Sequence, residues 1–332
     1  MAQTVRSGKI VVNDVEELNY AVSPWELVMR QLSSGRLDAR LDFVQLDGLL
    51  VNRERWSRQV FATGATPPGY LALAGPCTQR PFTWCGEEID PRHVACAFGR
   101  TETEFLTPDR SDHWVLLVPL DRITDHIGEA ALADAARQRR VLPCDPTVTR
   151  RIRAQVEAVR GTFGRHEHLL DDQRSVDTAV SGLLDSVGTL LIGAHPEGGL
   201  STPRKRDLGC RRALHLVDEL TNPIGVPELA KAVGVSRRVL ERGFHETVGV
   251  SPQRYLRWNR MNRLHRELRA AHSPEATVTQ LAQRWGFTEL GRMAGEYRQL
   301  FGELPSETLA GDRALPSTRL ADALPGAPAT AP

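Results

Sequence analysis

The chain has 332 residues, of which 41% are apolar and 25% charged, and its formal net charge is +1. This length is typical of two domains of roughly 150 residues each, and the composition excludes a disordered polyelectrolyte. No apolar run reaches the ~18 residues of a membrane span, and the N-terminal segment lacks the apolar stretch of a secretory signal. Together with five cysteines that never form a CxxC pair, these features predict a cytoplasmic protein without a membrane partner.

Residues 1–122 are predicted to form a β-rich domain. Short apolar segments, such as 93–98 and 113–118, alternate with turn-forming prolines and glycines. Short strands spaced by about 10–20 residues indicate a sandwich or barrel, here with a jelly-roll or cupin-like fold. Within this domain, the pattern of residues 24–33 favours one short helix.

Residues 123–206 are predicted to form a helical connector. Apolar residues recur at i, i+3, i+4 and i+7 in 146–163 and 175–192, which is the pattern of two amphipathic helices. Their apolar faces need a partner, and either a two-fold dimer interface or packing on the β-rich domain would supply one. The composition of 194–206 is that of a flexible linker, and 311–332 is expected to be a disordered tail rich in Ala, Pro, Ser and Thr.

Residues 207–310 are predicted to form an all-α domain, so the fold class of the whole chain is α+β. Between 204 and 310 there are 18 Lys and Arg against 12 Asp and Glu, whereas the remainder carries a net charge of −5. A basic end of this kind suggests an anionic partner. The same domain contains an internal repeat, because a set of residues of matching type recurs after 52 or 53 positions. Val226, Leu229, Ala230 and Gly234 recur as Val278, Leu281, Ala282 and Gly286, and Leu240, Phe244, Gly249 and Pro252 recur as Met293, Tyr297, Gly302 and Pro305.

Each repeated unit has the features of a helix-turn-helix. Gly234 suits the turn after the first helix, and Ser236 is a good N-cap for the second. Leu240 and Phe244 are the predicted buried anchors of that second helix. An ordinary hairpin with a solvated charged face would explain one such unit, but a matched pair in a basic region favours DNA binding, because arginine recognises guanine and phosphate. The opposite face of the second helix carries Arg237, Arg238, Glu241 and Arg242.

A long helix is predicted to join the two units, from Pro252 to Ala271, with Ser251 as its N-cap. A helix of about 20 residues spans roughly 30 Å, which is close to the ~34 Å of one turn of B-DNA. Two recognition helices held at this spacing can enter successive major grooves. Arginines recur along the helix at every third position, and Arg254 and Arg257 among them are predicted to contact DNA.

The region 208–309 resembles the DNA-binding domain of the AraC/XylS family of bacterial transcription regulators. The resemblance rests on 278–287 (VTQLAQRWGF) and 297–305 (YRQLFGELP), which are similar to the family elements IA-xxx-GF and F-xxxx-G-xx-P. Met293 stands where the family usually has an aromatic anchor, and Gly295 replaces a usual arginine, so we expect the first unit to carry more of the sequence specificity. Combined with this resemblance, the predicted DNA-binding residues are Ser236, Arg237, Arg238, Glu241, Arg242, Arg254, Arg257, Thr288, Glu289, Leu290, Arg292 and Arg298.

The N-terminal domain is weakly similar, in 59–64 and 83–86, to sensor domains of the ethanolamine-regulator type. This similarity implies a domain that senses an effector or forms a dimer. His93 and His113 lack the HxH spacing of metal cupins, and no nucleophile or nucleotide motif is present, so we expect no metal, no cofactor and no catalytic residue. The predicted effector-binding residues are Trp56, Trp84, His93 and Trp114, and the alternative for the three tryptophans is that they fill the core.

These features predict a sequence-specific DNA-binding transcription regulator whose two helix-turn-helix units bind successive major grooves. The family resemblance implies an effector-responsive activator that acts as a homodimer, with RNA polymerase and a small-molecule effector as partners. The alternative is a ligand-independent DNA-binding dimer, either a repressor or an architectural protein. A third hypothesis is a cupin-type enzyme fused to DNA-binding helices.

Overall fold

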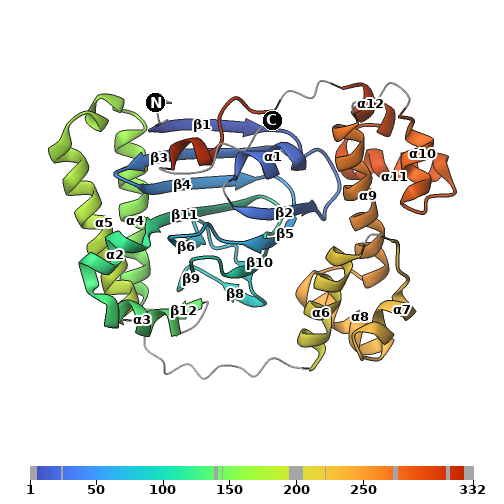
Figure 1. Cartoon of the computed structure of the whole chain (residues 1–332), viewed down its shortest axis with the longest axis horizontal. Coiled ribbons are helices and arrows are strands. Elements are labelled where there is room, and N and C mark those ends of the chain that lie inside the picture. Colours follow the sequence, from blue (N-terminus) through green and yellow to red (C-terminus); the bar gives the residue numbers. More distant parts are fainter. Residues whose placement is uncertain are drawn as a thin grey trace. The chain divides into compact units, whose positions relative to one another are not determined.

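The computed structural model describes residues 6–23, 25–137, 141–143, 145–193, 205–220, 222–271, 276–311 and 315–324. They divide into two compact units. The N-terminal unit contains the described residues up to 29, those of 37–199 and those from 315 on, and the C-terminal unit contains 30–36 and the described residues of 200–314. The predicted α+β class is confirmed, because the first unit combines β-sheets with helices and the second consists of helices (Figure 1). Most of the predicted linker, 194–204, lies outside the described residues.

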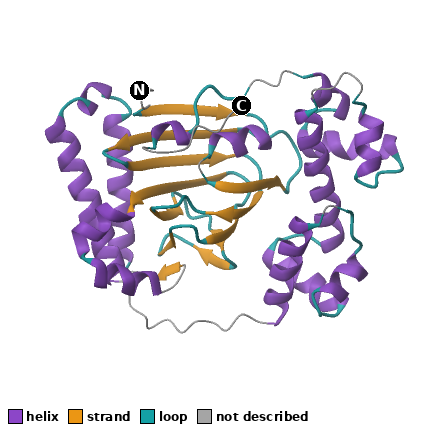
Figure 2. Ribbon diagram, in the orientation of Figure 1, coloured by secondary structure: helices purple, strands orange, loops and turns teal. Residues whose placement is uncertain are grey.

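The N-terminal unit is built on two β-sheets (Figure 2). One has seven strands in the order β1-β3-β4-β11-β6-β9-β12, and the other has five in the order β2-β5-β10-β7-β8. The strands are β1 (Ser7–Val12), β2 (Glu26–Gln31), β3 (Ala39–Leu46), β4 (Leu49–Trp56), β5 (Val60–Ala65), β6 (Tyr70–Pro76), β7 (Phe82–Trp84), β8 (Glu87–Ile89), β9 (His93–Phe98), β10 (Glu102–Leu106), β11 (Ser111–Pro119) and β12 (Val141–Pro143).

The two faces of the seven-stranded sheet have different partners, because successive side chains of a strand point to opposite sides. In the antiparallel pair of β4 and β11, His113 lies opposite Glu54 and Ser111 lies opposite Trp56. This face meets the five-stranded sheet, since the ring centroids of Trp56 and of Phe105 on β10 are 5.9 Å apart. Trp114, one residue along β11, belongs instead to the core cluster that the sheet shares with the helices.

Five helical segments follow β11, and all five contribute residues to that core cluster. Ile152 and Val156 from α4, and Leu183 and Val187 from α5, pack with the sheet residues of the cluster. The second of our two hypotheses for these apolar faces is therefore confirmed: they pack on the β-rich domain. α5 is long and apolar enough to cross a membrane, but half of that stretch is buried. The segments are α2 (Leu120–Ile127), α3 (Glu129–Arg137), α4 (Pro146–Phe163), η1 (Glu167–Leu170) and α5 (Gln173–Gly193).

The helix predicted over 24–33 is wrong, because Glu26–Gln31 form β2 at the edge of the five-stranded sheet. β2 approaches its neighbour β5 closely: a Cβ at Gly64 would lie 1.9 Å from the Glu26 carbonyl oxygen. This strand-to-strand contact overrides the local helix preference of the segment. The helix of this region lies earlier, at α1 (Val15–Ala21), where the Asp14 carboxylate accepts hydrogen bonds from the first backbone N–H groups.

Part of the predicted disordered tail is ordered. Residues 320–323 form the short helix η2 (Leu320–Ala323), in which Leu320 is buried. Arg319 forms an ion pair with Asp322, and its guanidinium lies 5.3 Å from the ring of Tyr20. A composition-based prediction missed this segment because a few buried apolar residues anchor it, namely Leu320, Ala321, Ala323 and Leu324. Residues 312–314 and 325–332 of the predicted tail lie outside the described residues.

The C-terminal unit consists of seven helices among its described residues and includes the segment 30–36. Arg30 forms an ion pair with Asp218, the Gln31 N–H donates to Asn262 Oδ1 at 2.9 Å, and the Gly35 N–H donates to the Gln299 carbonyl at 2.7 Å. β2 therefore begins in one unit and ends in the other. The helices are α6 (Lys205–Glu219), α7 (Val226–Ala232), α8 (Arg237–Thr247), α9 (Pro252–Ala270), α10 (Val278–Arg284), α11 (Leu290–Phe301) and α12 (Pro305–Ala310).

Candidate DNA-binding surface

The first helix-turn-helix is formed by α7 and α8. Gly234 has a φ of +71°, which lets the chain turn sharply after α7. The Ser236 hydroxyl accepts the Val239 N–H and so caps α8. Leu240 and Phe244 are both fully buried. The two predicted anchors and the predicted cap are therefore confirmed in their structural roles.

The exposed face of α8 carries the predicted recognition residues. Arg237 Nε donates to Glu241 Oε1 at 2.9 Å, and Arg242 Nε donates to Glu246 Oε1 at 2.9 Å. Arg238 is exposed and forms no ion pair or hydrogen bond with any residue that the structure describes. Because exposed ion pairs of this kind contribute little stability, DNA can compete with the glutamates for Arg237 and Arg242. Arg238 can bind DNA without first breaking an ion pair.

The second helix-turn-helix is formed by α10 and α11. Thr277 and Gln280 form a capping box at the start of α10, and Gly286 in the turn has a φ of +72°. Met293 and Tyr297 of α11 are buried, as predicted. Thus both units of the repeat share their turn and anchor geometry.

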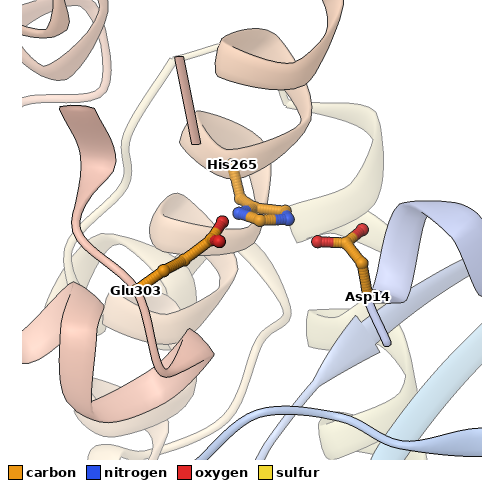
Figure 3. Close-up of side chains that lie close together, drawn as sticks. All are labelled: Asp14, His265 and Glu303. Atoms are coloured by element: carbon orange, nitrogen blue, oxygen red, sulfur yellow. The ribbon is translucent and has the colours of Figure 1, made fainter. Parts of the chain in front are cut away.

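Buried polar groups tie α11 and α12 to α9. His265 Nδ1 lies within hydrogen-bond distance of the Tyr297 hydroxyl, which lies 2.9 Å from Thr308 Oγ1. Thr308 in turn donates to the Glu303 carboxylate. Figure 3 shows the His265 ring and the Glu303 carboxylate directed toward each other. Since a half-satisfied buried network is costly, these four groups fix one arrangement of the second unit.

The outer face of α11 is less charged at its centre than that of α8. Arg292 pairs with Glu296 at 3.0 Å and with Glu289 at 3.6 Å. Partial burial acts to raise the pKa of Glu296, but hydrogen bonds from Arg257 and Arg292 hold it below its ordinary value. Thr288 and Arg298 are exposed at the two ends of the helix, and Leu290 at its start is half-buried.

The arginines of α9 divide into those that face solvent and those that hold the domain together. Arg254 is exposed and its guanidinium lies 4.3 Å from the centre of the Trp258 ring. Arg257 forms an ion pair with Glu296, and Arg260 lies 5.2 Å from the Phe287 ring. Arg263 donates to the Val217 carbonyl at 2.6 Å and thereby satisfies the C-terminal end of α6. A DNA contact by Arg254 is compatible with this geometry, whereas one by Arg257 requires it to share or release Glu296.

Comparisons with known proteins identify this region. A helix-turn-helix domain model matches residues 229–311. The probable thc operon regulatory protein of Rhodococcus erythropolis is 46% identical over 87 residues, which are 26% of this chain and 26% of that protein. The XylDLEGF operon transcriptional activator of Pseudomonas putida is 33% identical over 99 residues, 30% of this chain and 31% of that protein. Among solved structures, the AraC-like transcriptional activator CuxR is 15% identical, with a TM-score of 0.44 over 83% of this chain and 100% of that chain.

The C-terminal third of the chain is an AraC/XylS-type DNA-binding domain. The alignments cover about a quarter to a third of the two sequence relatives, so they concern this domain alone. At Gly295 the domain departs from the family pattern, which usually has an arginine there, and this departure has a physical consequence. This glycine lies in the interior of α11, and nothing lies within 4 Å of the position where its Cβ would be.

Gly295→Ala should stabilise the AraC/XylS-type domain by about 1 kcal/mol, because alanine removes the entropic cost of glycine in a helix interior without a clash. We expect calorimetry of the full chain to show a higher melting temperature for this domain. Gly302→Ala is the matched control: Gly302 has a φ of +82°, and its added Cβ would lie 3.0 Å from the Arg36 side chain, so this change should lower the melting temperature. A drop with Gly295→Ala would mean that α11 is not helical at this position.

The N-terminal unit contains a pocket between its two sheets. Its walls include Trp25, Phe82, Trp84 and Phe105, and its polar groups include Glu54, His113 and Thr107. The pocket measures about 450 Å³ including its mouth to solvent, but the centre of a water molecule can move through only 30 Å³ of it. It is narrow in this conformation, so any ligand larger than a few water molecules must displace part of the wall.

The structure does not bring the four predicted effector residues together. Trp84 lines the pocket, and Trp56 contacts the His113 ring edge-on at 4.9 Å. His93 instead lies 2.7 Å from Asp90, and Trp114 belongs to the helix-facing core cluster. Trp56, His93 and Trp114 are not among the described residues that line the pocket, so their prediction as pocket residues is wrong: Trp56 packs on His113, His93 pairs with Asp90 at the start of β9, and Trp114 faces the helices. Sequence reasoning missed Glu54. The available signal was its position two residues before Trp56, which places both side chains on the same face of β4.

Proposed function

We propose that this chain is a sequence-specific transcription regulator that responds to an effector and activates its target genes. The observation that carries the proposal is the pair of helix-turn-helix units, each with an exposed charged recognition helix, at the two ends of α9. A helix of 19 residues spans roughly 28 Å, close to the ~34 Å turn of B-DNA. The names of the two relatives, an operon regulatory protein and an operon transcriptional activator, support the same function.

The path of β2 supports a response to an effector. Leu27 and Met29 of β2 line the pocket of the N-terminal unit. The next residues, Arg30 and Gln31, are bound within the C-terminal unit by Asp218 and Asn262. A ligand that displaces Leu27 or Met29 in the pocket wall therefore shifts β2, and the next residues of β2 are hydrogen-bonded to α6 and α9.

The remaining partners follow from the proposed role. We expect a homodimer that contacts RNA polymerase in the cytoplasm and that has no enzymatic activity. A ligand-independent DNA-binding dimer, acting as a repressor or an architectural protein, is the second candidate, and the narrowness of the pocket favours it.

Selection of binding sites from random DNA, followed by footprinting at two salt concentrations, tests the proposal. We expect a motif with two protected major-groove segments about one helical turn apart. The affinity should fall steeply as salt rises, because arginine contacts to phosphate release counterions. If no motif emerges from the selection, the regulator is not sequence-specific and the proposal fails. Protection of a single segment would mean that only one of the two units binds DNA.

A further inference from the structure

The pocket of the N-terminal unit contains a carboxylate that is nearly removed from solvent. The Glu54 side chain is 7% exposed. Among the described residues, it accepts one hydrogen bond, from Asn52 Nδ2 at 2.6 Å. His113 Nε2 lies 3.5 Å away, which is beyond a normal hydrogen bond. A buried carboxylate with a single hydrogen bond is costly, so the Glu54 carboxylate can still accept a hydrogen bond from a further donor.

The arginines beside Glu54 do not supply that donor. Because successive side chains of β4 point to opposite faces of the sheet, Arg53 and Arg55 point away from the face that carries Glu54. Arg53 pairs there with Asp112 at 2.7 Å and with Glu157 at 3.2 Å, and Arg55 pairs with Asp42. No Lys or Arg is among the described residues that line the pocket.

Aromatic rings form much of the remaining wall. Trp84 and Phe105 lie stacked, with centroids 5.9 Å apart, and the Phe82 ring lies 5.8 Å from the His113 ring. Faces of aromatic rings attract cations, and a carboxylate beside them supplies a charged acceptor. An anionic ligand would meet only the Glu54 charge, without a compensating arginine or lysine.

We propose that this pocket binds a small organic amine, whose ammonium group pairs with Glu54 and whose apolar part lies against Trp84 and Phe105. The assignment rests on the proposed effector response and names its chemical class. Ala74 on β6 forms part of the pocket wall. Because its side chain is small, it leaves space for the ligand that a larger side chain would fill. The His113 imidazole, held through Nδ1 at 3.0 Å from Ser111 Oγ, flanks the ammonium position.

Calorimetric titration of the full chain with three probes that share one ring tests the class of ligand. The probes are benzylamine, benzyl alcohol and benzoate, which are cationic, neutral and anionic. We expect benzylamine to bind most tightly and benzoate not to bind. Glu54→Gln should weaken benzylamine by about thirtyfold or more, because it removes one partner of a buried charge pair, and should leave benzyl alcohol unchanged.

Two further measurements keep the result interpretable. Ala74→Met retains Glu54 but fills the pocket, and it should abolish binding of benzylamine and benzyl alcohol alike. The DNA affinity of each variant, measured by fluorescence anisotropy, reports separately on the C-terminal domain. Binding of benzoate as tight as that of benzylamine, an unchanged benzylamine affinity in Glu54→Gln, or no saturable binding by any primary amine from propylamine to phenylethylamine would overturn the assignment. Retained DNA binding in that case leaves the proposed function intact.

Discussion

Phe244→Ala should lower the unfolding free energy of the DNA-binding domain by about 3–5 kcal/mol, because it removes a large buried ring and leaves a cavity. Phe244 is fully buried and meets the ring of Tyr255 edge-on, with centroids 5.3 Å apart. This contact joins α8 to α9, so its loss releases the recognition helix from its support. Urea denaturation followed by circular dichroism measures the change, and the selected DNA site should no longer be bound.

His245→Ala provides the matched control, since His245 is the next residue of α8 and is exposed. A surface substitution of this kind usually changes stability by less than about 0.5 kcal/mol. If Phe244→Ala cost no more than the His245 variant, the packing of α8 on α9 would be wrong, and with it the geometry of the first helix-turn-helix.

The DNA-binding domain could be predicted in detail because its signals are local. The Ser236 cap, the turn at Gly234 and the anchors Leu240 and Phe244 all lie within one short segment. Each is set by backbone geometry or by helix periodicity, which a single sequence displays. The repeat then doubled the number of positions that had to agree.

The α9 arginines show where such local reasoning ends. Their regular spacing predicts that some reach DNA and that the rest are solvated or bonded within the domain. Arg257, one of the two predicted contacts, pairs with Glu296, and Arg263 binds the end of α6. Those partners lie about 40 residues away in the chain, so no local pattern distinguishes them. Only Arg254 of the two predicted α9 contacts faces solvent.

The effector pocket was even less accessible to prediction, because it depends on strand pairing. Glu54 faces the pocket only because β4 pairs with β11 in the register that sets His113 opposite it. The same register turns Trp114 to the helices. A shift of one residue would exchange the two faces, and neither strand alone fixes that choice.

Arg238→Ala should weaken binding to the selected site by about fivefold to 150-fold, which corresponds to 1–3 kcal/mol, and should relax the base preference at one position of the site. The reason is geometric: Arg238 is exposed on α8 and has no ion-pair partner among the described residues, whereas Arg237 and Arg242 are each held by a glutamate. A free guanidinium can form the bidentate contact to guanine without first giving up a bond. Repeating the random-site selection with the variant measures the change in preference.

Arg150→Ala is the control for charge alone, because Arg150 is exposed on α4 of the N-terminal unit and its loss changes the net charge by the same amount. It should leave both the affinity and the preferred sequence unchanged. If Arg238→Ala weakened binding to all sequences equally and reduced the salt slope, Arg238 would contact phosphate. An unchanged motif would thus move the base contact to Arg237 or Arg242, and α8 would have to lie in the groove with the other edge of its exposed face toward the bases.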